Sequence, residues 1–312
     1  MNTPKVFVVI ASYNGVSWIK DCLDSLNLSE VPVFTIVVDN NSSDTTVDVI
    51  ETNFPNVTIL KQNENLGFGK ANNLGISHAL KLGADYVLLL NQDAKIRPST
   101  IKSLINAGKN YQEYGVLSPI HLNWDGNNLE HYFSKFALNN PNFYSDFVLE
   151  KKLKSVYEAP FVNAACWLLK RNILEVVGGF DPVFFHYGED NNYCQRVQYH
   201  GFKIGIVPNC FIEHDSVVRY TKPEELFTRN YYRDALNKLK INLCDINKVI
   251  NKSDYNGVRK HIFRLILINL FKFNFKNVIG YFKKYVYFNK AIASIEHSRN
   301  TTITKHPHYL DS

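Results

Sequence analysis

The sequence of 312 residues lacks any paired spacing of cysteines. It also lacks a long apolar run. About 20 apolar residues are needed to span a bilayer, and the longest candidate, residues 265–268, is interrupted at Asn269. The apolar residues 6–11 are too short for a signal-peptide core. An odd, scattered set of cysteines argues against a disulfide framework, so we expect reduced thiols, no membrane span, no signal peptide and a cytoplasmic location. The five cysteines are Cys22, Cys166, Cys194, Cys210 and Cys244.

Acidic residues are absent between Asp254 and Glu296. Residues 221–312 hold 17 Lys/Arg against 7 Asp/Glu, a net charge of +10, whereas residues 1–220 have a net charge of −4. The distribution predicts an acidic globular domain, residues 1–220, and a basic C-terminal extension, residues 221–312, that meets an anionic partner.

Short apolar runs alternate with helical patterns over the first 120 residues. This alternation predicts βαβ units and an α/β fold with a mostly parallel sheet. Right-handed crossovers place the loops after residues 11, 39 and 90 on one edge of that sheet. The expected strands are 5–11, 33–39, 57–61, 85–90 and 115–119, and the expected helices are 16–28, 43–53, 69–82 and 98–112.

The pattern changes after residue 120. Residues 121–158 have weak periodicity and are interpreted as a variable insertion or a lid. Clear strand and helix patterns return over residues 160–215, and from residue 222 onward the pattern is helical. The expected elements are strands at 161–169, 203–207 and 210–212 and a helix at 190–200.

Two polar clusters follow predicted strands, Asp39–Asp44 and Asn91–Asp93. Ligands of open α/β sheets bind at the carboxyl ends of strands. The first cluster suits a base or ribose, or only an Asx-rich turn that caps the next helix. Asp93 could supply the one carboxylate that Mg²⁺ takes beside phosphate oxygens. A third loop, residues 63–73, contains Gly67 and Gly69 and opens a helix, where backbone N–H groups can hold a phosphate or a base.

Adjacent carboxylates, Glu189 and Asp190, lie at the start of another predicted helix. They suit the helix dipole, or one of them is a general base whose pKa the neighbouring carboxylate and aromatic residues raise. His214 follows a short predicted strand, and it is either structural or a metal ligand with Asp93.

Together these motifs resemble the family two glycosyltransferases over residues 5–220 or so. Val8–Asn14 is similar to the family's opening strand and nucleotide-contacting turn, and Val38–Asp44 to its second nucleotide motif. Asn65–Asn73 is similar to the Asn-x-Gly segment, and Asn91–Asp93 occupies the Asp-x-Asp position. Gly179–Gly201 matches the acceptor-side signature.

The resemblance implies a GT-A fold with a nucleotide half at about 1–120 and an acceptor half at about 121–220. It also implies inverting transfer of a sugar from a nucleotide-diphosphate donor to a glycan or lipid-linked acceptor in surface polysaccharide synthesis. Asp190 would be the base, with Glu189 as second choice, and Asp93 and His214 would hold Mg²⁺ or Mn²⁺. The donor would contact Ser12, Tyr13, Asn14, Asp39, Asn65, Gly67, Lys70, Asn72 and Asn91.

The chain departs from the family pattern at two places. Asn91 stands where relatives carry the first Asp, which removes one formal charge from the metal site. Asn191–Tyr193 differs where relatives often carry an Asp and a Leu. Residues 90–93 and His214 also resemble rhamnosyltransferases, which points to dTDP-rhamnose, with a UDP-sugar as an equal alternative.

The basic extension permits two interpretations. Apolar residues from Phe275 to Val286 follow helical spacing, with lysines on the other face. A basic amphipathic helix of this kind is typical of an anionic membrane surface, here the inner face of the cell membrane, or it packs on the domain as an ordinary helix. Two other functions stay open: a non-catalytic nucleotide-sugar or membrane-binding homologue, and a nucleotidyltransferase. No recognised nucleic-acid-binding module accompanies the charge.

Overall fold

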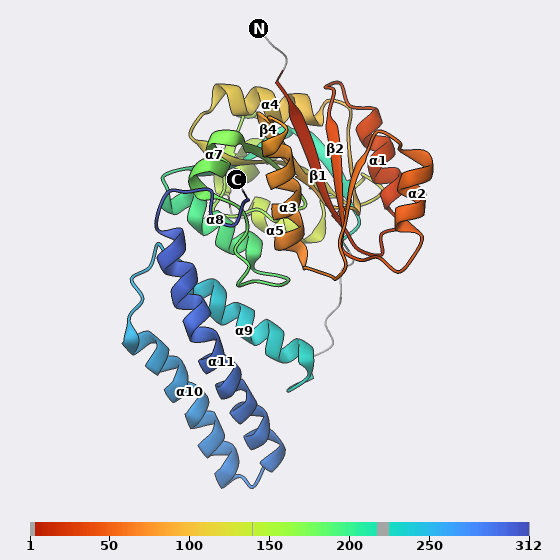
Figure 1. The fold of residues 1–312 in the computed structure, drawn as a ribbon. Coiled ribbons are helices and arrows are strands. Elements are labelled where there is room, and N and C mark those ends of the chain that lie inside the picture. Colours follow the sequence, from red (N-terminus) through yellow and green to blue (C-terminus); the bar gives the residue numbers. More distant parts are fainter. Residues whose placement is uncertain (1–3, 139, 217–224, 312) are drawn as a thin grey trace. The chain divides into compact units, whose positions relative to one another are not determined.

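The computed structural model describes residues 4–138, 140–216 and 225–311. The chain divides into two compact units, Met1–Val218 with Lys305–Ser312, and Arg219–Thr304. The first unit is an α/β domain and the second is helical (Figure 1). The predicted α/β fold with a C-terminal helical extension is confirmed.

One sheet forms the centre of the first unit, with strand order β3-β2-β1-β4-β8-β6-β9-β5 and β7 paired to β9. The β3-β2-β1-β4 half is parallel, as the alternation of strands and helices predicts, and β8 joins it to the other half by antiparallel pairing. The strands are β1 Val6–Ser12, β2 Phe34–Asp39, β3 Thr58–Lys61, β4 Tyr86–Leu90, β5 Ala94–Ile96, β6 Tyr114–Leu122, β7 Tyr157–Glu158, β8 Cys166–Lys170 and β9 Lys203–His214.

Helices cover both faces of the sheet. Alternate residues of β1 enter different cores: Val9 packs with α3, and Ile10 packs with α1 and α4. A Cβ on Gly75 of α3 would lie 2.3 Å from Val9 Cγ1, so this helix approaches the sheet more closely than a larger residue permits. The helices of this unit are α1 Ile19–Asn27, α2 Thr46–Asn53, α3 Phe68–Lys81, α4 Thr100–Asn110, α5 His131–Leu138, α6 Pro141–Val148, α7 Arg171–Val177 and α8 Glu189–Tyr199.

The prediction for the last strand is wrong in one respect. Two short strands were expected at 203–207 and 210–212, but β9 is one strand of 12 residues. Its pairing with β6 jumps from Val207 to Phe211 between the adjacent residues Pro119 and Ile120. The polar break in the sequence is therefore a bulge within a continuous strand.

The last residues of the chain pack against the first unit. The backbone N–H of Gly179 donates to His308 O at 2.8 Å, and the Tyr309 hydroxyl donates to Asp181 Oδ2 at 3.1 Å. A Cβ on Gly178, whose φ is +80°, would lie 2.3 Å from His308 O. The tail thus packs on the turn that leads toward α8.

The second unit consists of α9 Arg229–Leu243, α10 Lys252–Phe271 and α11 Phe275–Thr302. A capping box at Asn251 begins α10, and the side chain of Asn274 caps α11. Phe288 and Ile295 of α11 are buried, whereas the residues around the turn between α10 and α11 are exposed. None of the described helices combines the length and apolar character that a membrane span requires.

Candidate functional site

The first turn of the site joins the ends of β1 and β2. Their register pairs Ser12 with Asp39. Asn14, with φ of 47°, accepts a hydrogen bond from the Ser43 N–H at 2.8 Å, and its own N–H donates to Ser42 Oγ at 2.9 Å. Two predicted nucleotide segments are thus fixed to each other at the carboxyl edge of the sheet.

Asp39 presents an unused acceptor at this edge. The residue is 3% exposed, and its Oδ2 accepts the Ser42 N–H at 3.1 Å. Its Oδ1 is buried and has no hydrogen-bond partner among the described residues. A buried acceptor without a partner is costly, so Asp39 is suited to receive an N–H or O–H group from a nucleoside.

Gln92 connects the β1 turn to the end of β4, a role that the sequence analysis missed. Its Oε1 accepts from the Ser12 hydroxyl at 2.8 Å and from the Tyr13 N–H at 3.0 Å, and its Nε2 donates to Tyr13 O at 3.1 Å. The Ser12 hydroxyl is therefore used inside the protein, while the Tyr13 ring is exposed.

The Gly-containing loop, residues 63–73, lies beside the acceptor segment, residues 179–201. Asn65 Oδ1 accepts the N–H of Gly67 at 2.9 Å, and Gly67 adopts φ of +80°. Asn72 is buried and donates to Phe68 O at 3.0 Å, whereas Lys70 is exposed.

Asn73 joins this loop to the acceptor side. Its Oδ1 accepts the Phe180 N–H at 2.7 Å, and its Nδ2 donates to Phe180 O at 2.7 Å. A Cβ on Gly69 would lie 3.8 Å from Glu189 Cβ. The loop and the acidic start of α8 are therefore direct neighbours.

Glu189 and Asp190 occupy the first turn of α8. Burial, and then the charge of Asp190, raise the pKa of Glu189 to about 7. Burial raises the pKa of Asp190 to about 6, although the N–H groups of Asn191 and Ala164 partly offset this effect. Glu189 Oε2 is buried without a partner among the described residues. Raised carboxyl pKa values suit proton transfer near neutral pH.

The Asp93 end of the site depends on strand pairing that the sequence did not reveal. The antiparallel ladder of β5 and β9 pairs Ala94 with His214, and Asp215 N donates to Asp93 O at 2.9 Å. Asp93 Oδ1 thereby lies 3.4 Å from His214 Nε2. The Trp18 indole donates to Asp215 Oδ2 at 2.7 Å.

These residues form a donor set that fits a divalent cation. Asn91 Nδ2 also lies 3.4 Å from His214 Nε2, and Asn91 Oδ1 is buried without a partner among the described residues. Carboxylate and amide oxygens are ligands of Mg²⁺ and Mn²⁺, and imidazole is a common transition-metal ligand. The structure therefore brings together the two predicted metal ligands, Asp93 and His214.

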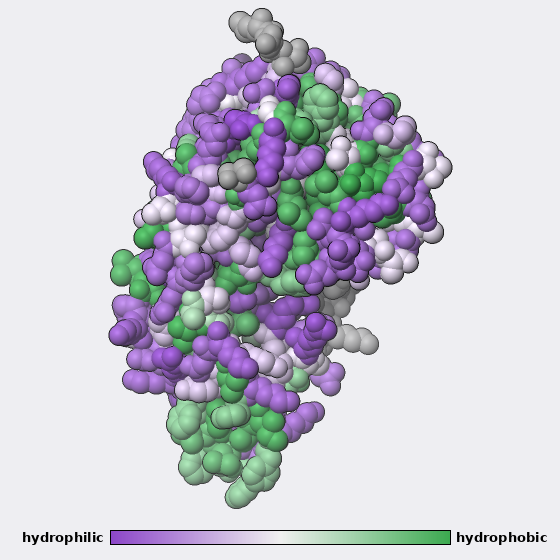
Figure 2. Space-filling view, viewed as in Figure 1, coloured by the Kyte–Doolittle hydropathy of each residue, from purple (hydrophilic) through white to green (hydrophobic). Residues whose placement is uncertain are grey.

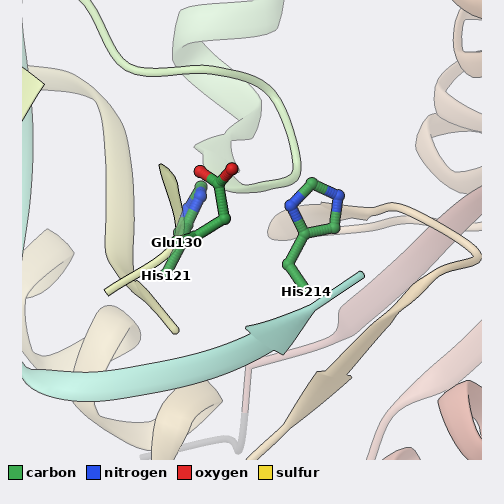
Figure 3. A group of neighbouring side chains, drawn as sticks. All are labelled: His121, Glu130 and His214. Carbon is green, nitrogen blue, oxygen red and sulfur yellow. The ribbon is translucent and has the colours of Figure 1, made fainter. Parts of the chain in front are cut away.

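Two further buried residues adjoin His214 (Figure 3). His121 lies one residue before the end of β6, and Glu130 immediately precedes α5. Burial, and then the neighbouring His214, lower the pKa of His121 well below its usual value. Neither residue was predicted as part of the site, because a lone His and a lone Glu in a weakly periodic segment carry no signal.

Comparison with known proteins identifies the family. The family model "Glycosyl transferase family 2" matches residues 7–178. The chain belongs to this family. It is therefore a glycosyltransferase, as the motifs predicted.

Two curated relatives are rhamnosyltransferases. The chain is 26% identical over 230 residues to the N-acetylglucosaminyl-diphospho-decaprenol L-rhamnosyltransferase of Mycobacterium tuberculosis, covering 66% of this chain and 75% of that protein. It is 25% identical over 296 residues to the dTDP-rhamnosyl transferase RfbF of Shigella flexneri, covering 90% and 93%.

Solved structures share the fold of this glycosyltransferase. Residues 1–349 of S. aureus TarS with UDP-GlcNAc superpose with a TM-score of 0.55 at 15% identity, covering 96% of this chain and 88% of that chain. The mannosyltransferase PcManGT from Pyrobaculum calidifontis with GDP-Man and Mn²⁺ gives a TM-score of 0.52 at 16% identity, covering 95% and 76%. The predicted GT-A fold is confirmed.

Proposed function

We propose that this glycosyltransferase transfers a sugar, with inversion, from a nucleotide-diphosphate donor to a hydroxyl of a glycan or lipid-linked acceptor in surface polysaccharide synthesis. The observation that carries the proposal is the carboxyl pair at the start of α8, with raised pKa values, beside the loop of Gly67 and Gly69. The two rhamnosyltransferase relatives support dTDP-rhamnose as the donor over a UDP-sugar.

In this reaction Asp190 accepts the proton of the acceptor hydroxyl. The acceptor oxygen bonds to the anomeric carbon while the bond from that carbon to the diphosphate oxygen breaks, and the nucleoside diphosphate departs. Attack from the face opposite the leaving group inverts the anomeric configuration. Asp39 contacts the nucleoside through its unused Oδ1, and Asn91 lies near the ribose.

Asp93 and His214 would hold Mg²⁺ or Mn²⁺ against the donor diphosphate. Their 3.4 Å separation and the unpartnered Asn91 Oδ1 support this assignment. The bound ion would neutralise charge on the leaving group. The structural neighbour PcManGT is in complex with GDP-Man and Mn²⁺.

A donor and product assay tests the proposed function. We expect turnover with dTDP-L-rhamnose and a diphosphate-linked lipid acceptor, and a product whose anomeric configuration in NMR spectra is opposite to that of the donor. Retention of configuration would reject inversion. Turnover with UDP-sugars alone would reassign the donor, and donor binding without any turnover would favour the non-catalytic homologue.

Substitution of Asp93 tests the metal assignment. In the wild type we expect Mn²⁺ to strengthen dTDP binding at least tenfold in calorimetry, because the ion links the diphosphate to the carboxylate. Asp93→Ala should abolish this enhancement. Asp125→Asn, which removes a charge from an exposed loop, is the control and should behave as wild type. Equal enhancement in Asp93→Ala would show that another residue holds the ion.

We also propose that the helical unit binds an anionic membrane surface. Apolar side chains gather where α10 meets α11 (Figure 2). Phe271 is 81% and Phe273 80% exposed there. Basic residues accompany them, and no acidic residue lies between Asp254 and Glu296. Exposed aromatic residues flanked by lysines suit the interface of an anionic bilayer. The lysines next to these aromatic residues in the sequence are Lys272 and Lys276.

Vesicle binding distinguishes this role from ordinary exposed residues. Fully burying a Phe side chain is worth about 1.5–3 kcal/mol, so the double variant Phe271→Ser/Phe273→Ser should bind phosphatidylglycerol vesicles at least about tenfold more weakly. Val249→Ser is the control, because Val249 is 92% exposed in the same unit but outside the α10–α11 turn. Equal sedimentation of both variants with vesicles would reject the proposal, as would wild-type binding that is equal on neutral phosphatidylcholine.

A further inference from the structure

Three polar residues meet inside the first unit, close to the proposed donor site. His121, Glu130 and His214 are 0%, 1% and 7% exposed. They come from β6, the segment before α5, and β9, so strand pairing and the start of a helix fix their backbones. One candidate ligand atom of each lies within 4.8 Å of those of the other two.

The carboxylate of Glu130 has a structural role that accounts for part of this cluster. Its oxygens accept the N–H groups of Tyr132 at 2.9 Å and Phe133 at 2.6 Å, and also the hydroxyl of Ser216. These contacts satisfy the first turn of α5. They leave further lone pairs on the carboxylate, and they do not explain why two imidazoles are buried beside it.

In each imidazole, Nε2 lies near a polar group, whereas Nδ1 has no hydrogen-bond partner among the described residues. His121 Nε2 lies 3.0 Å from the Ser118 hydroxyl, and His214 Nε2 lies 3.4 Å from Asp93 Oδ1. Both Nδ1 atoms are buried without a partner among the described residues. In Figure 3 one ring nitrogen of His214 faces Glu130 and the other faces away. A buried polar group left unpaired costs about 1–3 kcal/mol, so two such nitrogens beside a carboxylate are suited to bind a ligand.

We propose that His121, Glu130 and His214 bind a transition-metal ion of the zinc class, separate from the ion that Asp93 would share with the donor diphosphate. Two imidazoles and one carboxylate are a zinc donor set, whereas Mg²⁺ prefers oxygen ligands alone. Atoms bound at 2.0–2.2 Å around a tetrahedral ion are about 3.4 Å apart, so the side chains need to converge by about an ångström. An imidazole that binds zinc through Nδ1 carries its proton on Nε2, so His214 would donate a hydrogen bond to Asp93, and Asp93 would then hold the donor's ion without His214.

Metal binding without nucleotide tests this inference independently of transfer activity. Chelator-treated wild-type protein should take up one Zn²⁺ per chain, measured by elemental mass spectrometry after gel filtration. His121→Gln and Glu130→Gln should bind Zn²⁺ at least about 100-fold more weakly, and Asp93→Asn should bind it as the wild type does. The reverse pattern, loss in Asp93→Asn and retention in His121→Gln, would overturn the proposal, as would no uptake by the wild type.

A second measurement avoids reliance on variants that fail to fold. X-ray absorption of the zinc-loaded wild type should show scattering from two imidazole rings around the ion. A spectrum with oxygen ligands only would assign the zinc to another site and reject the cluster. Folding of each variant is checked by circular dichroism.

Discussion

Asp190→Asn is expected to lower kcat by about 10³-fold, within the range that general base catalysis contributes. Asn cannot accept the proton of the acceptor hydroxyl, but it matches Asp in size. The KM for the donor should change little, because donor contacts are assigned to other residues. Glu189→Gln is the control, and its smaller loss would identify Asp190 as the base. Full activity of Asp190→Asn would reject the assignment.

The pH dependence gives the same assignment an independent readout. Burial raises the pKa of Asp190 to about 6 in the protein without substrate, and a base must be ionised to act, so wild-type kcat/KM should fall as pH decreases through about 6. Residual activity of Asp190→Asn should lack this decrease. The interval from about pH 5 to 8 contains the pKa of Asp190, so a wild-type profile that is flat across it would argue against a carboxyl base.

As pH rises through the pKa of Asp190, stability should fall while activity increases. Because the pKa of Asp190 is about 6 in the folded protein and 3.8 is its ordinary value, the folded state binds more protons between these limits. The free energy of unfolding therefore falls as pH rises through this interval, and the penalty persists above it. Asp190→Asn removes the buried charge and should raise the free energy of unfolding at pH 8 by about 1–2 kcal/mol. A simple loss of structure would lower it.

The sequence predicted the elements that local patterns define. The parallel strands at 34–39 and 86–90 and the start of α8 are clear because apolar runs and helix signals are local. β5 was missed because it has only three residues, Ala94–Ile96, and exists through pairing with β9 more than 110 positions along the chain. That pairing is also what places His214 beside Asp93.

Side-chain neighbours that depend on tertiary structure could not be read from the sequence. Glu130 lies in a weakly periodic segment that was interpreted as an insertion or a lid, yet its carboxylate is fixed by backbone N–H groups. The packing of His308 on Gly179 likewise follows a return of the chain from the helical unit. The roles assigned to Asp39, Asp93 and Asp190 stay predictions, although the structure gives each a specific environment.

Gly67→Ala is expected to lower the free energy of unfolding by several kcal/mol and to weaken donor binding. Gly67 has φ of +80°, and a Cβ there would lie 2.1 Å from the backbone oxygen of Phe185. With ψ of 171°, Gly67 adopts a backbone conformation that is nearly restricted to glycine, and this conformation alone costs another residue about 1–3 kcal/mol. The overlap adds to this because it falls on backbone, which cannot rotate away. The loop and the acceptor segment must then separate.

Gly201→Ala is the matched control for this prediction. Gly201 has φ of +85°, but nothing lies within 4 Å of the Cβ position. Its substitution should therefore cost only the conformational part, about 1–2 kcal/mol. The difference between the two variants in urea unfolding measures the contact between Gly67 and Phe185 together with the added backbone strain at Gly67. Equal losses would show that the loop and the acceptor segment do not constrain each other. A larger loss in Gly67→Ala together with weaker dTDP binding would show that this close approach shapes the donor site.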